Sequence, residues 1–123
     1  MMETKIAQLN TYFADKLEEC GRRKAALIAD DRKDEADLCQ IRANIYDIFK
    51  TILSVAVRTQ KSEEGVNSFF AKKLREMTNT WAESGEKASA HGDMQKATIE
   101  QIKVETAEEI RRVFEKIWGK FND

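Results

Sequence analysis

The sequence predicts an all-α protein, an antiparallel up-down-up-down four-helix bundle made of two helical hairpins. Three observations lead to this expectation: the 123 residues contain no proline, apolar residues recur at helical spacing in four long segments, and the connections between these segments are short. Helix interiors exclude proline, whereas turns, edge strands and linkers commonly use it. Short connections between long amphipathic helices favour antiparallel neighbours. At this length a single domain over residues 1–123 is expected.

The first hairpin is expected over residues 3–59. Its first helix carries an apolar residue at every seventh position, namely Ile6, Phe13, Cys20 and Leu27. In its second helix the apolar residues alternate spacings of three and four, as in a helix that packs along another helix. These residues are Leu38, Ile41, Ile45, Ile48, Ile52 and Val55. Asp30 or Asp31 is expected to cap the second helix, and one continuous bent helix is the alternative.

The second hairpin is expected over residues 66–121, after a polar loop at 60–65 in which Ser62 is a candidate cap. Gly85 costs a helix about 1 kcal/mol relative to alanine, so the end of the third helix is expected to be the least stable helical part. His91, Gly92 and Asp93 read as a helix C-cap, a left-handed glycine and an N-cap. The fourth helix is expected to bury Ile99, Ile102, Ile110, Val113, Ile117 and Phe121.

The two hairpins resemble each other when the chain is shifted by 61 residues. Ala29 then aligns with Ala90, and Gln40 aligns with Gln101. An internal duplication would produce this match, and so would any two amphipathic hairpins aligned along their apolar stripes. Both explanations predict two similar hairpins related by approximate two-fold symmetry.

The charge balance excludes several classes of protein. Lys and Arg number 21 and Asp and Glu number 22, for a formal net charge of −1, whereas a duplex-binding domain usually shows a basic excess.

The beginning of the sequence lacks the apolar core of a signal peptide, and the longest apolar run is too short to cross a bilayer. Two cysteines without Cys-x-x-Cys spacing are typical of free thiols in a reducing compartment. We therefore expect a cytoplasmic protein that binds neither membrane nor, as its main role, nucleic acid.

The residues that usually carry catalysis are missing. The single histidine, His91, is not preceded by the Glu-x-x spacing of a di-iron bundle. Paired glutamates occur at Glu18-Glu19 and Glu108-Glu109, but an arginine stands where a magnesium-binding helix would need a third carboxylate. There is no phosphate-binding glycine loop and no nucleophile motif. The sequence thus predicts no enzyme, no metal and no cofactor, with a magnesium-dependent nucleotide hydrolase as the remaining enzymatic alternative.

Aromatic residues are expected to gather where the second and fourth helices end and the first and third begin. Since aromatic residues are enriched at the centres of interfaces, this end is a candidate contact for a second copy or another protein. The alternative is that these rings fill the core of the bundle. The interface candidates are Tyr46, Phe49, Leu53, Phe69, Phe114, Trp118 and Phe121.

A self-associating protein–protein interaction module, with a homodimer or a protein partner, is therefore the function that the sequence favours. The main alternative is a small-ligand or peptide-binding bundle. Small residues follow Trp81 along the third helix and would leave room there for a ligand. The pocket candidates are Met77, Trp81 and Ala88. Weak binding of nucleic acid is the third alternative.

Overall fold

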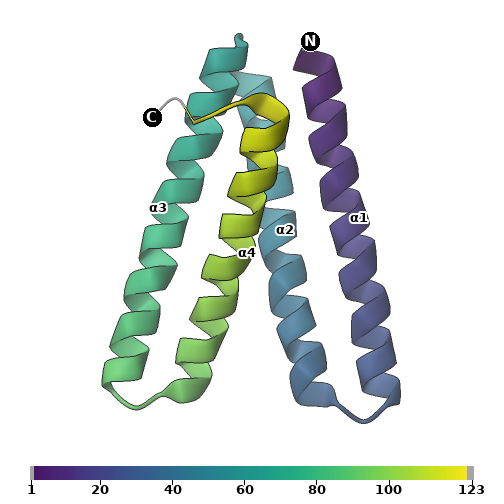
Figure 1. The fold of residues 1–123 in the computed structure, drawn as a ribbon, viewed down its shortest axis with the longest axis vertical. Helices are drawn as coiled ribbons and strands as arrows, with labels where there is room; N and C mark the ends of the chain where they lie inside the picture. The colour runs from purple at the N-terminus through teal and green to yellow at the C-terminus, as the bar shows by residue number, and fades with distance from the viewer. Residues whose placement is uncertain (1, 122–123) are drawn as a thin grey trace.

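The computed structural model describes residues 2–121, which form four helices. These are α1 (Met2–Ala29), α2 (Lys33–Thr59), α3 (Glu63–Ala90) and α4 (Met94–Trp118). Successive helices run in opposite directions, down, up, down and up in the view of Figure 1, so the predicted antiparallel four-helix bundle of two hairpins is confirmed. The predicted bounds of 1–123 run past these limits, because Met1, Asn122 and Asp123 lie outside the described residues.

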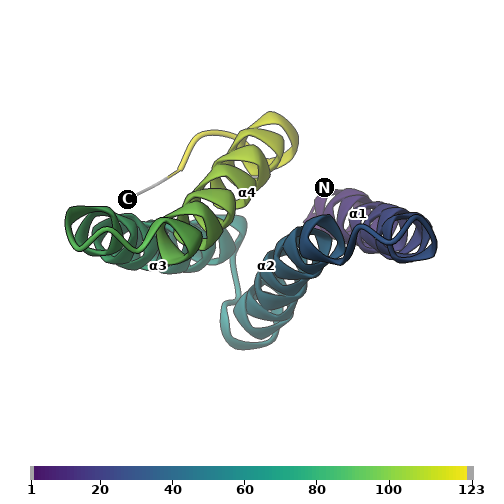
Figure 2. The same ribbon diagram turned by 90° about the horizontal axis from the view of Figure 1, so that it is seen from below.

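The two hairpins converge at one end and diverge at the other. Each helix packs mainly against the other helix of its own hairpin, and α2 and α4 supply the largest contact between the hairpins. Viewed from below, the α1–α2 turn and the α3–α4 turn stand apart, on either side of the molecule (Figure 2). We call the half of the molecule that holds these turns the open end.

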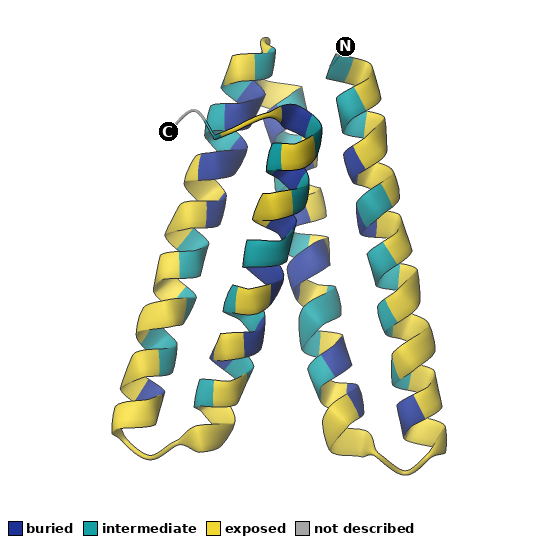
Figure 3. Cartoon of the chain, viewed as in Figure 1, coloured by how far each residue is buried: buried dark blue, intermediate teal, exposed yellow. Residues whose placement is uncertain are grey.

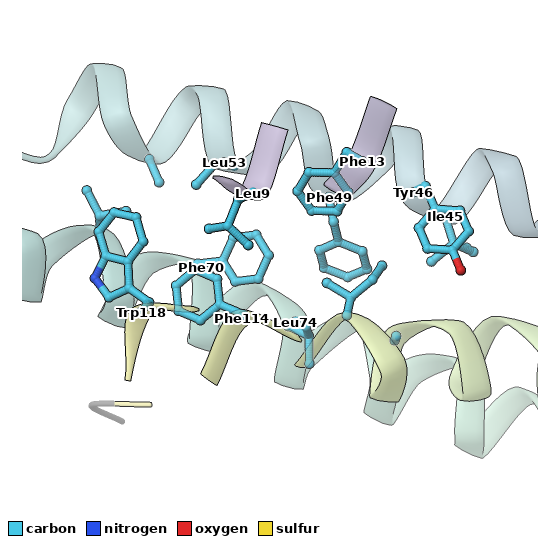
Figure 4. Close-up of a cluster of buried hydrophobic side chains, with 14 residues drawn as sticks. Leu9, Phe13, Ile45, Tyr46, Phe49, Leu53, Phe70, Leu74, Phe114 and Trp118 are labelled. Atoms are coloured by element: carbon cyan, nitrogen blue, oxygen red, sulfur yellow. The ribbon is translucent and has the colours of Figure 1, made fainter. Parts of the chain in front are cut away.

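The main core lies in the half opposite the turns, where the hairpins converge (Figure 3). Each helix contributes one phenylalanine that is fully buried: Phe13, Phe49, Phe70 and Phe114. The rings of Phe70 and Phe114 stack with their centroids 4.4 Å apart (Figure 4). A separate small cluster of Leu27, Ala36 and Cys39 lies within the first hairpin. The large side chains therefore hold the two hairpins together at one end.

The face that α2 turns to the core differs from the predicted one. Of its six-membered apolar stripe only Ile45 is buried, and the other five side chains are half-buried. The deeply buried positions lie beside that stripe: Tyr46, Phe49, Leu53 and Ala56. The physical reason is that α2 contacts all three other helices, which requires an apolar arc wider than a two-helix seam.

The two hairpin turns have the same geometry although their sequences differ. In each, two backbone N–H groups bond back to the end of the preceding helix: Asp31 to Ile28 and Arg32 to Leu27, then Gly92 to Ser89 and Asp93 to Ala88. This is the Schellman pattern, which needs a left-handed residue after the helix. Asp31 has φ 58° and Gly92 has φ 76°, so these two residues, 61 positions apart, hold the same place.

The predicted caps are right at one turn and wrong at the other. His91 is the C-cap of α3, and the side chain of Asp93 accepts a hydrogen bond from the Lys96 N–H, as expected. The N-cap of α2, however, is Arg32, and no side chain caps that helix. Asp31 does not cap it because its backbone already occupies the left-handed position of the turn.

Substitutions at these two equivalent positions should have opposite effects. Asp31→Gly is expected to raise the free energy of unfolding by about 0.5 kcal/mol, because glycine adopts a positive φ without steric cost. Gly92→Ala should lower it by about 1 kcal/mol for the same reason. Urea unfolding followed by circular dichroism measures both. Stabilisation by Gly92→Ala would contradict the assignment of a left-handed turn.

The connection between the hairpins is shorter than predicted. Helix α3 begins at Glu63, so Gly65 lies in its first turn and not in a loop. The reason is local capping: the Ser62 hydroxyl accepts a hydrogen bond from the Gly65 N–H at 3.0 Å, and two glutamates follow at the positive end of the helix. After α4, the Lys120 carbonyl accepts a hydrogen bond from the Asn67 side chain, which brings Phe121 back onto the core.

Candidate functional site

Three polar side chains tie the hairpins together near the middle of the molecule. The hydroxyls of Tyr12 on α1 and Tyr46 on α2 both donate to Oε2 of Glu109 on α4, and the Tyr46 bond measures 2.6 Å. The two tyrosine rings meet edge to face. Burial, reinforced by the hydrogen bonds to the Glu109 carboxylate, raises the pKa of both phenols. We call this group the tyrosine–glutamate clamp.

On the open side of this clamp, a cleft separates the N-terminal halves of α2 and α4. Its volume is about 480 Å³. Half-buried aliphatic side chains from both helices line it: Leu38, Ile41 and Ile99. We call this space the α2–α4 cleft, and the 61-residue correspondence places it symmetrically, since Leu38 of α2 is equivalent to Ile99 of α4.

The charged side chains that line the α2–α4 cleft are acidic, and one of them, Glu35, forms an ion pair with Arg32. The described residues that line it include Asp34, Glu35 and Asp37, all exposed, and no basic side chain. These acids occupy the first turns of α2, where the helix dipole favours negative charge. Two further apolar residues stand exposed near the turns, Ile28 at 54% and Met94 at 61%. The open end thus combines uncovered apolar surface with an acidic rim.

All seven predicted interface residues are buried or half-buried within the chain itself. Tyr46, Phe49, Leu53, Phe114 and Trp118 are buried in the core of the chain itself, and Phe69 and Phe121 are half-buried against that core. The Trp118 indole N–H also donates to the Glu63 carbonyl at 3.2 Å. A partner could reach these buried rings only if the helices separated. The large apolar side chains that are exposed among the described residues, Ile28 and Met94, lie at the opposite end.

The predicted pocket residues are brought together in part. Trp81 lines a pocket of about 320 Å³ between α3 and α4. Met77 accompanies Trp81 in a neighbouring depression. Ala88 is buried at 5% exposure and lines neither space. The edge of the Trp81 ring meets Phe49 of α2, with the two rings at 90° to each other, so this tryptophan is held in place by the core.

The Cys20 thiol is poorly placed for nucleophilic chemistry. Cys20 and Cys39 are both free, and both line a cavity beside the tyrosine–glutamate clamp. Burial raises the pKa of the Cys20 thiol, which lowers the fraction of reactive thiolate at neutral pH. Reactive cysteines require the opposite shift.

Some of these residues carry a signal in the sequence that the apolar pattern alone does not reveal. Glu109 follows Ile102 by one heptad, so it is a carboxylate at an apolar position of α4. A carboxylate at such a position needs hydrogen-bond donors beside it. The chain contains two tyrosines, and the hydroxyls of both donate to Glu109. Periodicity predicts that Leu38, Ile41 and Ile99 lie on apolar helix faces, but it does not show which element covers those faces. In the structure these three side chains are half-buried and line the cleft.

Comparison with known proteins adds no relative to this description. No protein-family model, no curated protein and no solved structure matches the chain. Among residues 2–121, no group of three or more acidic, histidine or cysteine side chains is arranged to hold a metal ion. Within the same range, none of the helices has the length and apolar character required to cross a membrane.

Proposed function

We propose that this protein is a non-catalytic protein–protein interaction module whose contact surface is the α2–α4 cleft. The observation that carries the proposal is the half-buried aliphatic floor of that cleft, formed by Leu38, Ile41 and Ile99. Apolar surface left uncovered between two helices of a folded domain is typical of a site for a partner.

The occupant that fits this cleft is an amphipathic helix with basic flanks. Leu38 and Ile41 belong to an apolar stripe with alternating spacings of three and four residues. The apolar face of a second helix packs against such a stripe. The acidic side chains at the rim attract lysine and arginine on either side of the apolar face of that helix. A reducing compartment such as the cytoplasm suits the protein, since both of its cysteines are thiols.

A designed peptide tests the proposal. An amphipathic helix with leucines at i, i+4 and i+7 flanked by lysines is expected to bind with saturation in fluorescence anisotropy. Ile99→Glu should weaken its binding by about tenfold or more, because the variant places a charge in the apolar floor. Raising the ionic strength should also weaken binding, since the rim charges are exposed.

The matched control is Ile28→Glu. It introduces the same charge at the same end of the molecule, on a residue that is 54% exposed and does not line the cleft, so the affinity for the basic peptide should not fall. Equal binding of a charge-reversed peptide with glutamates in place of lysines would contradict the proposed partner chemistry. A dimer in sedimentation that Ile99→Glu abolishes would instead assign the cleft to a second copy of the chain, the self-association expected from the sequence.

A further inference from the structure

We infer that the pocket between α3 and α4 beside Trp81 is a binding site for a primary alkylammonium group, such as the side chain of a lysine. This site is distinct from the α2–α4 cleft and would serve a function beyond helix binding. The carboxylate of Glu100 lies in the wall of this pocket. In the first hairpin, the equivalent position is occupied by the side chain of a lysine, Lys24.

The pocket has a buried acid in its wall. Glu100 is only 7% exposed and lines the space together with Trp81 and Gly85. Its Oε1 accepts a hydrogen bond from Lys103 at 3.2 Å, whereas its Oε2 is buried without a hydrogen-bond partner among the described residues. An unsatisfied buried carboxylate oxygen is costly, so Glu100 places a carboxylate that still lacks one hydrogen bond in the wall of the pocket.

The equivalent place in the first hairpin is occupied by a lysine. There the Lys24 ammonium donates to Oε1 of Gln40 at 2.8 Å across the α1–α2 groove. The 61-residue correspondence, which relates the ends and turns of the two hairpins, aligns Gln40 with Gln101 and Lys24 with Gly85. Gln101 and Gly85 both line the pocket. The second hairpin therefore keeps the acceptor and lacks the lysine side chain.

Two further features suit an alkylammonium ligand. The indole of Trp81 offers an apolar wall for its methylene chain and an aromatic face for its charge. The described residues that line the pocket include the carboxylates of Glu86 and Glu100 and no basic side chain. A lysine-like group would thus find the side chains of Trp81, Glu86, Glu100 and Gln101 around a volume of about 320 Å³. It would share the Glu100 carboxylate with Lys103, which pairs with Oε1.

Nuclear magnetic resonance of the ¹⁵N-labelled full chain tests this inference with Nα-acetyl-lysine amide as the probe. We expect saturable shifts of the Trp81 indole and Gly85 amide signals, with the Trp118 indole unchanged as an internal control. Nα-acetyl-norleucine amide, which has the same chain length without the ammonium group, should produce no such shifts. Binding of pentylamine with similar affinity would identify a free amine as sufficient, and binding of the amide alone would indicate a lysine within a peptide.

Two variants locate the site. Glu100→Gln should weaken binding about tenfold, since it removes a charge-assisted hydrogen bond. Glu64→Gln, at an exposed glutamate in the first turn of α3, should leave it unchanged. Gly85→Lys should fold and bind no probe, because its own side chain would take the place that Lys24 has in the first hairpin. A Cβ at Gly85 would lie 3.2 Å from Cβ of Glu100, so circular dichroism must first show that this variant is helical.

The inference is overturned by equal binding of the norleucine probe, or by unchanged affinity in Glu100→Gln. Absence of any saturable shift at millimolar probe would also reject it. The Glu100→Gln result decides the question even if Gly85→Lys does not fold.

Discussion

Replacing Phe114 by alanine is expected to lower the free energy of unfolding by about 3–5 kcal/mol, the usual range for a fully buried phenylalanine. The ring is 0% exposed and contacts three other aromatic rings: its centroid lies 4.4 Å from Phe70, 5.5 Å from Trp118 and 5.4 Å from Phe121. Because these contacts pack α4 against α3 and against the chain that follows α4, in the region where the large side chains gather, the substitution leaves a cavity that small movements cannot close. Urea unfolding monitored by circular dichroism measures the loss.

Phe69→Ala is the matched control for that prediction. Phe69 is half-buried, and Lys73 lies over its ring at 5.9 Å, so its removal should cost clearly less than the removal of Phe114. The comparison also separates the two interpretations of the aromatic residues. If they form an interface between copies, Phe114→Ala should change the sedimentation coefficient of the folded protein, whereas a core residue changes only its stability.

The second large effect is expected in alkaline solution, where the tyrosine–glutamate clamp should make the protein unstable. The pKa of both phenols is raised in the folded state, first by burial and then by the hydrogen bonds to Glu109. Their contribution to stability is therefore complete below pH 10, the ordinary pKa of tyrosine, and is lost as the pH rises above it. Above pH 10 each tyrosine should remove at most about 1.4 kcal/mol per pH unit, and the half-buried Tyr12 less than this, since the unfolded chain releases a proton that the folded chain keeps.

Tyrosine absorbance checks this directly, because Tyr12 and Tyr46 are the only two tyrosines in the chain. The rise in absorbance at 295 nm should coincide with the loss of helical circular dichroism. Tyr12→Phe should remove about half of the tyrosine contribution to the pH dependence of stability, and lysine titration, which is common to both proteins, serves as the reference. Absorbance that rises near pH 10 while the helices remain intact would show that the phenols are not held as described.

Much of the fold can be predicted from local patterns. The absence of proline and the four apolar periodicities predict the helices, and short connections predict their antiparallel order. The left-handed Gly92 and the caps at Ser62 and Asp93 follow from residue types whose backbone preferences act over a few positions. The cap of the first turn was predicted wrongly because Asp31 adopts the left-handed conformation there. An aspartate indicates this conformation much less clearly than a glycine does.

The candidate sites depend on distant parts of the chain. Periodicity shows that Leu38 and Ile41 lie on an apolar face of α2, but the angle between the hairpins decides whether α4 covers them. In the same way, Glu100 is one of many glutamates in a charged sequence until the close approach of α3 at Gly85 buries it. Burial and orphaned hydrogen-bonding groups depend on contacts between segments and therefore cannot be obtained from spacing along one segment.

The sequence by itself determined the class of fold and the number and order of the helices, since these depend on composition and local periodicity. Only the tertiary structure decided which apolar residues are buried in the core and which remain uncovered. The large aromatic side chains pack together at one end, while the smaller side chains toward the turns leave the hairpins apart. That difference in side-chain volume between the two ends makes the aromatic end a core and leaves apolar surface uncovered at the open end, where we propose that a partner binds.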